Sequence, residues 1–281
     1  MIDTPRKNEI FIPAGEERQH VQNQTGLVFD VPTIDVPLPS MGSVYPEGHP
    51  LSGKTSVVIS SMTAAQENIL TNKSLAKKGT LLTQFVQSCL QDKKINAREM
   101  LMGDRSVIMI AARISGYGAD YKFKVSCTEC EEKSQQVFNL EKFPIRYLSL
   151  KPVENGMNLF EMTLPQTKAV VRFRFLTGAD EEEFSVAQTQ KKKIGPGVGD
   201  ADIITSGLIQ SVVSINGITD RNQIALAIPR MPAFDSKALR RFIQDNEPGM
   251  QLNGEMTCPS CNYTGEVSVS LGPEFFWPGS E

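Results

Sequence analysis

Two stretches of this 281-residue sequence decide its fold: Cys127-Thr128-Glu129-Cys130 and Cys258-Pro259-Ser260-Cys261. Apolar and polar residues alternate before each stretch, and strand-like residues follow it, which predicts two hairpins with a cysteine pair at each tip. Two such pairs match the ligand set with which four thiolates enclose a tetrahedral ion. We therefore expect one shared zinc-ribbon site that is made by Cys127, Cys130, Cys258 and Cys261.

The distance between the two pairs is unusual. In the sequence, 127 residues separate Cys130 from Cys258, whereas a zinc ribbon commonly has roughly two dozen residues between its pairs. We interpret the chain as a split ribbon with a domain inserted between its halves, so that the ion offsets the entropy of closing a long loop. Two alternatives stay open, disulfide or thiol redox chemistry and sites without metal. A thioredoxin-like site is disfavoured because each pair lies between strands.

The expected ion is structural, with one zinc per chain. Four thiolates leave no open coordination position for a substrate, so we expect no enzyme activity from this site. Binding of the ion would contribute on the order of 10 kcal/mol to folding. The sequence does not distinguish zinc from iron, because both ions accept a four-thiolate set.

Short capped helices are expected before the first cysteine pair. Thr63 with Gln66 and Asn96 with Glu99 have the spacing of helix N-terminal caps. Between them, apolar residues recur every three or four positions over residues 81–90, which predicts a helix with Cys89 as a core residue. Asp104 is expected to cap a fourth helix that ends at Gly116 and Gly118.

The region between the cysteine pairs has its own strand and helix signals. Val171, Phe173 and Phe175 alternate with arginines as in a half-buried strand. A helix is expected from Asp180 to the lysine triplet at 191–193. The remaining expectations are a helix capped by Asp200 or Asp202 that runs through Val212 and Val213, a turn at Asn216-Gly217, and a helix opened by Asp235-Ser236 with Leu239, Phe242 and Ile243.

These signals divide the chain into four parts of an α+β fold. We expect an extended proline-rich arm over residues 1–60, a helical region with the first hairpin over 61–144, an inserted mixed domain over 145–249, and the second hairpin with an aromatic tail over 250–281. The arm carries regularly spaced apolar residues and is interpreted as lying on another surface, with a disordered tail as the alternative. The tail either folds back onto the ribbon or docks on a neighbour.

Composition limits the other function classes. The formal net charge of −3 supplies no global basic field for nucleic acid. A secretion signal and a membrane span are not expected, so the chain is expected to be soluble and cytoplasmic where it is made. Gly195-Pro196-Gly197-Val198-Gly199 lacks the Lys-Ser/Thr of a phosphate-binding loop, and only His20 and His49 could supply imidazole chemistry.

Several stretches resemble the baseplate hub subunit family of contractile-tailed, T-even-type bacteriophages. The resemblance is carried by residues 62–80 with their ILTNKSL motif, by Leu101-Met102-Gly103-Asp104-Arg105, and by residues 116–121 before Cys127. It covers residues 60–150 well, extends more loosely through the inserted region and returns at the second cysteine pair.

The resemblance implies a non-enzymatic structural component of the virion, in the tail baseplate, that is assembled in the host cytoplasm. Its implied partners are other baseplate and tail-tube proteins and copies of itself around the tail axis, with no nucleic acid and no membrane. Two alternatives are kept: a zinc-ribbon nucleic-acid or transcription accessory protein, and an assembly chaperone that leaves before the particle matures.

Overall fold

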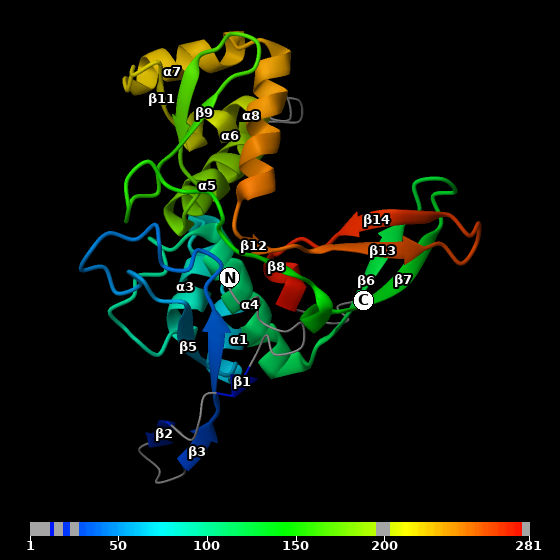
Figure 1. Ribbon diagram of the computed structural model, residues 1–281. Coiled ribbons are helices and arrows are strands. Elements are labelled where there is room, and N and C mark those ends of the chain that lie inside the picture. The colour runs from blue at the N-terminus through cyan, green and yellow to red at the C-terminus, as the bar shows by residue number, and fades with distance from the viewer. Residues whose placement is uncertain (1–11, 14–18, 23–27, 195–202, 277–281) are drawn as a thin grey trace, which may run out of the picture.

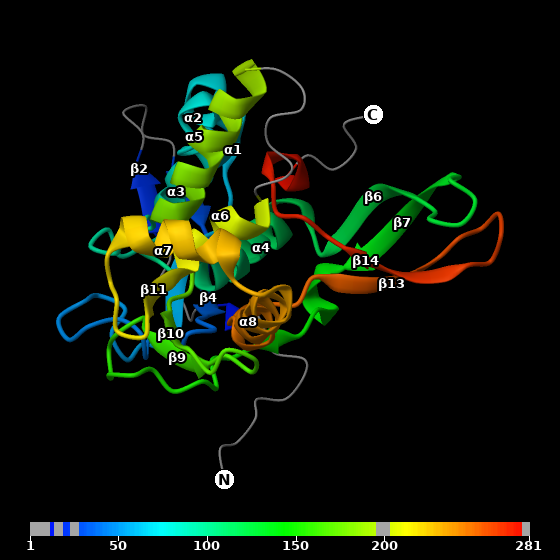
Figure 2. The same ribbon diagram turned by 90° about the horizontal axis from the view of Figure 1, so that it is seen from above.

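The computed structural model describes residues 12–13, 19–22, 28–194 and 203–276. These residues form a central body, an inserted part at one end of the body, and two hairpins that project sideways (Figure 1). The two projecting hairpins are called the arm from here on, and they are distinct from the proline-rich segment expected over residues 1–60. Figure 2, turned by 90°, shows the same projection, so the arm stands clear of the body. The fold is a mixture of helices and small antiparallel sheets, in agreement with the expected class.

The described part of the body contains four short to medium-length helices. They are α1 (Ala64–Leu70), α2 (Lys73–Lys78), α3 (Leu81–Cys89) and α4 (Met102–Tyr117). The predicted cap of α1 is confirmed, because the Thr63 amide donates to Gln66 Oε1 at 3.0 Å and the Thr63 side chain accepts from the next turn. The predicted stripe of α3 is also confirmed, and Cys89 is fully buried in it.

The predicted helix at Asn96 is wrong. Asn96 Oδ1 does accept from the Arg98 amide at 3.1 Å, as a cap would, but residues 97–99 form only a turn. The carbonyls that would continue a helix are used elsewhere: Arg98 and Met100 accept from the backbone amides of Ala179 and Gly178 at 2.8 and 3.0 Å. The inserted part thus takes the hydrogen bonds that a helix would need.

The predicted cap Asp104 is also wrong, because α4 begins two residues earlier. Its first amide, that of Met102, donates to the Leu176 carbonyl of the inserted part at 2.9 Å, so no side-chain cap is needed. The Asp104 side chain is fully buried and accepts from the Ser40 amide, the Ser40 hydroxyl and the Tyr45 hydroxyl at 2.9, 2.7 and 2.7 Å. It holds an N-terminal loop against α4.

The expectation that residues 1–60 form a separate arm is wrong from Thr33 onward. The strands of this region are β1 (Ile12–Pro13), β2 (Gln19–Gln22), β3 (Val28–Val31), β4 (Thr33–Pro37) and β5 (Ser56–Ser60). β4 pairs with β5 and β1, and Val36, Leu38 and Ile59 are fully buried in the core of the body. Pro32 and Pro37 lie before and at the end of β4, so they do not interrupt its pairing.

The inserted part starts and ends at neighbouring points. β8 (Ile145–Arg146) pairs antiparallel with β12 (Gly249–Met250), so the chain leaves the body and returns to it side by side. Between these strands lie β9 (Phe160–Thr163), β10 (Val170–Phe173), α5 (Gly178–Ile194), α6 (Ile203–Ser211), β11 (Val212–Ile215), α7 (Arg221–Ala227) and α8 (Ala233–Asn246). The division of the chain into separately folding domains stays a prediction.

The inserted sheet has the order β11-β10-β9, and its predicted strand residues Val171, Phe173 and Phe175 are buried. The helix over α5 and the turn at Asn216-Gly217 are confirmed, both turn residues having positive φ. The helix expected through Val212 and Val213 ends at Ser211 instead, because the next residues form β11 against β10. Asp200, Asp202 and the loop 195–199 lie outside the described residues.

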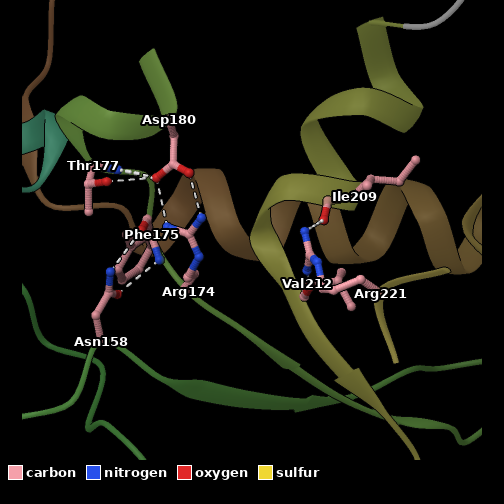
Figure 3. Close-up of polar contacts among 8 residues, drawn as sticks. All are labelled: Asn158, Arg174, Phe175, Thr177, Asp180, Ile209, Val212 and Arg221. Carbon is pink, nitrogen blue, oxygen red and sulfur yellow. Dashed lines mark hydrogen bonds and ion pairs between the residues drawn. The ribbon is translucent and has the colours of Figure 1, made fainter. Parts of the chain in front are cut away.

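Polar contacts fix the inserted part internally (Figure 3). Asp180, near the start of α5, accepts from both guanidinium nitrogens of Arg174 and from the amide and hydroxyl of Thr177. Asn158 pairs with the backbone of Phe175 through bonds of 2.8 and 3.0 Å. Arg221 donates to the carbonyls of Val212 and Ile209 and so ties α7 to α6 and β11.

The described part of the aromatic tail, which ends at Phe276, folds back onto the chain itself, and Trp277 lies outside the described residues. The short 3₁₀ turn Pro273–Phe276 places Phe275 and Phe276 in the core, both fully buried. The ring centroids of Phe276 and Phe85 lie 4.5 Å apart, and Arg113 Nε donates to the Phe275 carbonyl at 3.0 Å. Of the two predicted alternatives, folding back onto the ribbon is the nearer one, because Phe275 packs on Tyr121 of the first hairpin, but the tail also packs on α3 and α4 of the body. Two further 3₁₀ turns are Leu140–Lys142 and Ile228–Arg230.

Candidate metal centre

Two hairpins of the same design form the arm. β6 (Asp120–Ser126) pairs with β7 (Lys133–Asn139), and β13 (Asn253–Thr257) pairs with β14 (Thr264–Ser268). Their last paired residues are Ser126 with Lys133 and Thr257 with Thr264, so each tip is a loop of six residues that begins with a cysteine. Both predicted hairpins are therefore confirmed, and the register puts each cysteine pair where the strands end.

The two tips have the same backbone structure. In the first, the Cys127 amide donates to the Glu132 carbonyl at 2.9 Å and the Glu131 amide donates to the Cys127 carbonyl at 3.0 Å, with Glu131 at φ 58°. In the second tip, the Cys258 amide donates to the Tyr263 carbonyl at 2.8 Å and the Asn262 amide donates to the Cys258 carbonyl at 3.0 Å. Asn262 is the left-handed residue, with φ 57°. The sequence-based prediction did not include this left-handed residue after each cysteine pair. Asn262 could have indicated it, because Asn adopts positive φ more often than most residues.

The structure brings all four predicted ligands together. Cys127 Sγ lies 3.7 Å from Cys261 Sγ, and Cys130 Sγ lies 3.6 Å from Cys258 Sγ. The four sulfurs all lie within 4.8 Å of one another. Zinc–sulfur bonds of about 2.3 Å place the sulfurs of a tetrahedral site about 3.8 Å apart, so the observed spacing fits a four-thiolate ion.

A small apolar cluster lies between the two hairpins, next to their tips. Met256 is buried together with Cys127 and Cys258, and Val125, Tyr263 and Val267 pack around them. Further from the tips, the ring of Phe138 lies against Gly254, where a Cβ would come within 2.8 Å of it. The cluster is too small to close two separate hairpins by burial alone, since each methylene group buried contributes only about 0.8 kcal/mol.

Hydrogen bonds at the tips shift the pKa values of the thiols in both directions. Backbone N–H groups of Cys261 and Ser260 lower the pKa of Cys258 to about 7. A hydrogen bond from the Glu132 backbone lowers the pKa of Cys130, but the hydrogen bond with Cys261, desolvation and the bonds with the other thiols outweigh it and raise this pKa to about 12. The backbone of the second tip thus favours the thiolate form of Cys258, and a bound cation would favour the thiolate form of each of its ligands.

Other candidate residues lie outside this centre. His49 stacks on Tyr45 with ring centroids 4.7 Å apart, and its Nε2 lies 3.5 Å from Glu99. Glu181 and Glu182 form ion pairs with Arg105 and Arg98 at 2.8 and 2.9 Å. Within the described ranges, the four cysteines are the one group of three or more potential ligands close enough to hold a metal ion.

Searches of curated proteins and of solved structures found no match to this chain. In the part of the chain that the structure describes, every helix is too short or too polar to cross a membrane. A family model does match, over residues 45–277, and it is the model described as T4 bacteriophage base plate protein. This match includes the body from Tyr45, the inserted part and both cysteine pairs. The chain therefore belongs to the T4 bacteriophage base plate protein family.

Proposed function

We propose that this baseplate protein is a structural component of the hub region of a contractile phage tail, in which Cys127, Cys130, Cys258 and Cys261 hold one zinc ion. The observation that carries the metal part is the position of four sulfurs from two distant hairpins at tetrahedral spacing. Family membership supports the baseplate role and a place in the virion tail.

The ion would supply architecture rather than chemistry. Four thiolates fill a tetrahedral shell, so no position remains for substrate or water, and we propose that the protein is not an enzyme. When bound, the ion supplies cohesion between hairpins whose shared apolar cluster is small. Iron is the competing ion for the same ligands.

Elemental analysis tests the metal. Protein purified without chelator is expected to contain one zinc per chain, and Cys127→Ser or Cys261→Ser should each lose it. Cys89→Ser is the matched control, because Cys89 is buried in α3 and belongs to no metal cluster. Iron in place of zinc would correct the ion, and the absence of both metals would refute the clamp.

The hub location and the partners are the finer part of the proposal. We propose that copies of the chain surround the tail axis and contact other baseplate proteins and the tail tube. The projecting arm supports this, because it offers a surface that the body leaves free.

Electron microscopy of tails with a labelled chain tests this location. Label near the axis of finished baseplates supports the proposal, whereas label confined to assembly intermediates would show a chaperone that leaves the particle. Binding of nucleic acid with a steep salt dependence would favour the accessory-protein alternative.

A further inference from the structure

The four thiols differ in exposure in a way that holding an ion does not require. Cys127 and Cys258, the first cysteine of each tip, are 2% and 0% exposed, whereas Cys130 and Cys261, the second of each tip, are exposed. Oxidants in solution reach exposed thiols first. Each tip therefore presents one sulfur to solvent and keeps one inside.

Each exposed sulfur lies against the buried sulfur of the opposite hairpin. Cys261 of the second tip is 3.7 Å from Cys127 of the first, and Cys130 of the first tip is 3.6 Å from Cys258 of the second. Both of these sulfur–sulfur contacts cross between the hairpins.

We propose that oxidation converts this cluster into two disulfides that link the hairpins, Cys127 to Cys261 and Cys130 to Cys258. This inference rests on the proposed metal clamp, because the oxidant consumes the thiolates that would hold the ion. A disulfide bond is about 2.05 Å long, so the sulfurs of each pair must approach by roughly 1.6 Å. Rotation of the two exposed side chains can supply this movement.

The chemistry balances with a peroxide as the oxidant. The thiolate of Cys130 or Cys261 attacks one oxygen of hydrogen peroxide, the O–O bond breaks, and a sulfenic acid and hydroxide form. The thiolate of Cys258 or Cys127 then attacks the sulfenic sulfur, the S–O bond breaks, and a second hydroxide leaves. Each pair loses two electrons to one peroxide, and two protons turn the hydroxides into water.

The consequence is a covalent closure that would survive loss of the ion. The proposed location in the virion tail would take a chain made in a reducing cytoplasm into an oxidising medium. Cross-hairpin disulfides would keep the 127 residues between Cys130 and Cys258 closed as a loop after release. Disulfides within each tip would leave the two hairpins unlinked.

Peptide mapping distinguishes these outcomes on the full-length chain. Trypsin places the two tips on different peptides, residues 125–133 and 242–281. After treatment with two equivalents of hydrogen peroxide per chain, we expect the two peptides to be joined, free thiols to fall from five to one and the bound metal to be released. The remaining thiol is Cys89, which is buried and whose pKa is raised to about 12.

Two variants and a metal-free sample complete the test. Cys130→Ser with Cys258→Ser leaves Cys127 and Cys261, and should still join the peptides. Cys127→Ser with Cys130→Ser leaves both thiols on one hairpin and should not. Disulfides confined to single peptides, or sulfinic acids on Cys130 and Cys261, would overturn the inference and leave the clamp intact. Joined peptides in a protein that never contains metal would support the pairing and refute the clamp.

Discussion

The hairpin tips and the first turn of α4 both hold distant segments together, but by opposite means. The tips lie in a projecting arm, and the apolar cluster buried at the tips consists of Cys127, Met256 and Cys258. The first turn of α4 lies inside the body, where Gly103, Asp104 and Arg105 contact three different segments. Four clustered sulfurs join the two tips of the arm, whereas many packed and hydrogen-bonded groups join the segments of the body.

Each residue of the α4 turn has its own partner. Gly103 lies against the Pro248 carbonyl, where the inserted part returns to the body. Asp104 binds the loop of Ser40 and Tyr45, and burial raises its pKa while these hydrogen bonds oppose the rise. Arg105, 1% exposed, pairs with Glu181 of α5 at 2.8 Å. Nη2 of Arg105 also donates to Thr83 Oγ1 at 3.2 Å, whereas its buried Nε and Nη1 have no hydrogen-bond partner among the described residues.

Removal of the metal should give the largest difference in stability between the arm and the body. A chelator is expected to unfold the arm, because the ion would contribute on the order of 10 kcal/mol there, while the body remains folded. Hydrogen exchange with mass spectrometry measures this: residues 120–139 and 253–268 should lose protection, whereas α3 and α4 should keep it. Unchanged protection of the hairpins would show that burial alone closes them.

Substitution of a buried tail residue should destabilise the body and leave the arm and its metal unchanged. Phe276→Ala removes a fully buried ring that packs on Phe85, and a loss of about 3–5 kcal/mol is expected. The metal content should not change, because the tail contacts the body. Val137→Ala is the control, since Val137 is an exposed residue of β7. Urea denaturation measures the stability, and loss of metal in Phe276→Ala would mean that the two regions fold as one unit.

The arm was predictable because its signals are local. Alternation with a period of two, a polar turn and the CxxC spacing all lie within about 20 residues, and together they predicted both hairpins and the cysteines at their tips. Thr63 with Gln66 predicted the start of α1 for the same reason. The cap of α2 at Asn72, which accepts from Ser74 and Leu75, was missed, although it is also local.

The body was less predictable because its partners are distant in sequence. Asn96 was predicted to cap a helix but only a turn follows it, because the backbone amides of Gly178 and Ala179 donate to the carbonyls of Met100 and Arg98. Asp104 looks like a cap in the sequence, yet it binds Ser40, 64 residues away. β4 was interpreted as an arm because its pairing with β5 is visible only in the fold. Local patterns do not record which non-local group satisfies a hydrogen bond.

Substitution of Gly103 should test how tightly the α4 turn is packed. An added Cβ would lie 1.8 Å from the Pro248 carbonyl oxygen, so Gly103→Ala is expected to lose about 3 kcal/mol. Gly207→Ala in α6 is the matched control, because nothing lies within 4 Å of its added Cβ. Helix propensity predicts a gain of up to about 1 kcal/mol for that control. Similar stabilities for both variants, measured in urea, would contradict the close contact.

The smallest expected effect concerns two buried carboxylates with opposite pKa directions. Burial alone would raise the pKa of Asp180, but hydrogen bonds from Arg174 and Thr177 lower it below the ordinary value (Figure 3). Its contribution to stability is complete above the ordinary pKa, near 3.9, and is lost as the pH falls through the lowered pKa of the folded state. Asp180→Asn should therefore cost about 1–3 kcal/mol at pH 7 and less at pH 3.

The stability deficit of Asp104→Asn should change with pH in the opposite direction to that of Asp180→Asn. Because the pKa of Asp104 is raised in the folded protein, its contribution is complete below the ordinary pKa and is lost as the pH rises through the raised value. Acidification therefore stabilises the wild type at this site, and the deficit of Asp104→Asn should grow between pH 7 and pH 3 while that of Asp180→Asn shrinks. Urea titrations of both variants and the wild type at the two pH values measure the difference. Deficits that change in the same direction would show that the α4 turn stabilises the charged form of Asp104, as α5 does for Asp180.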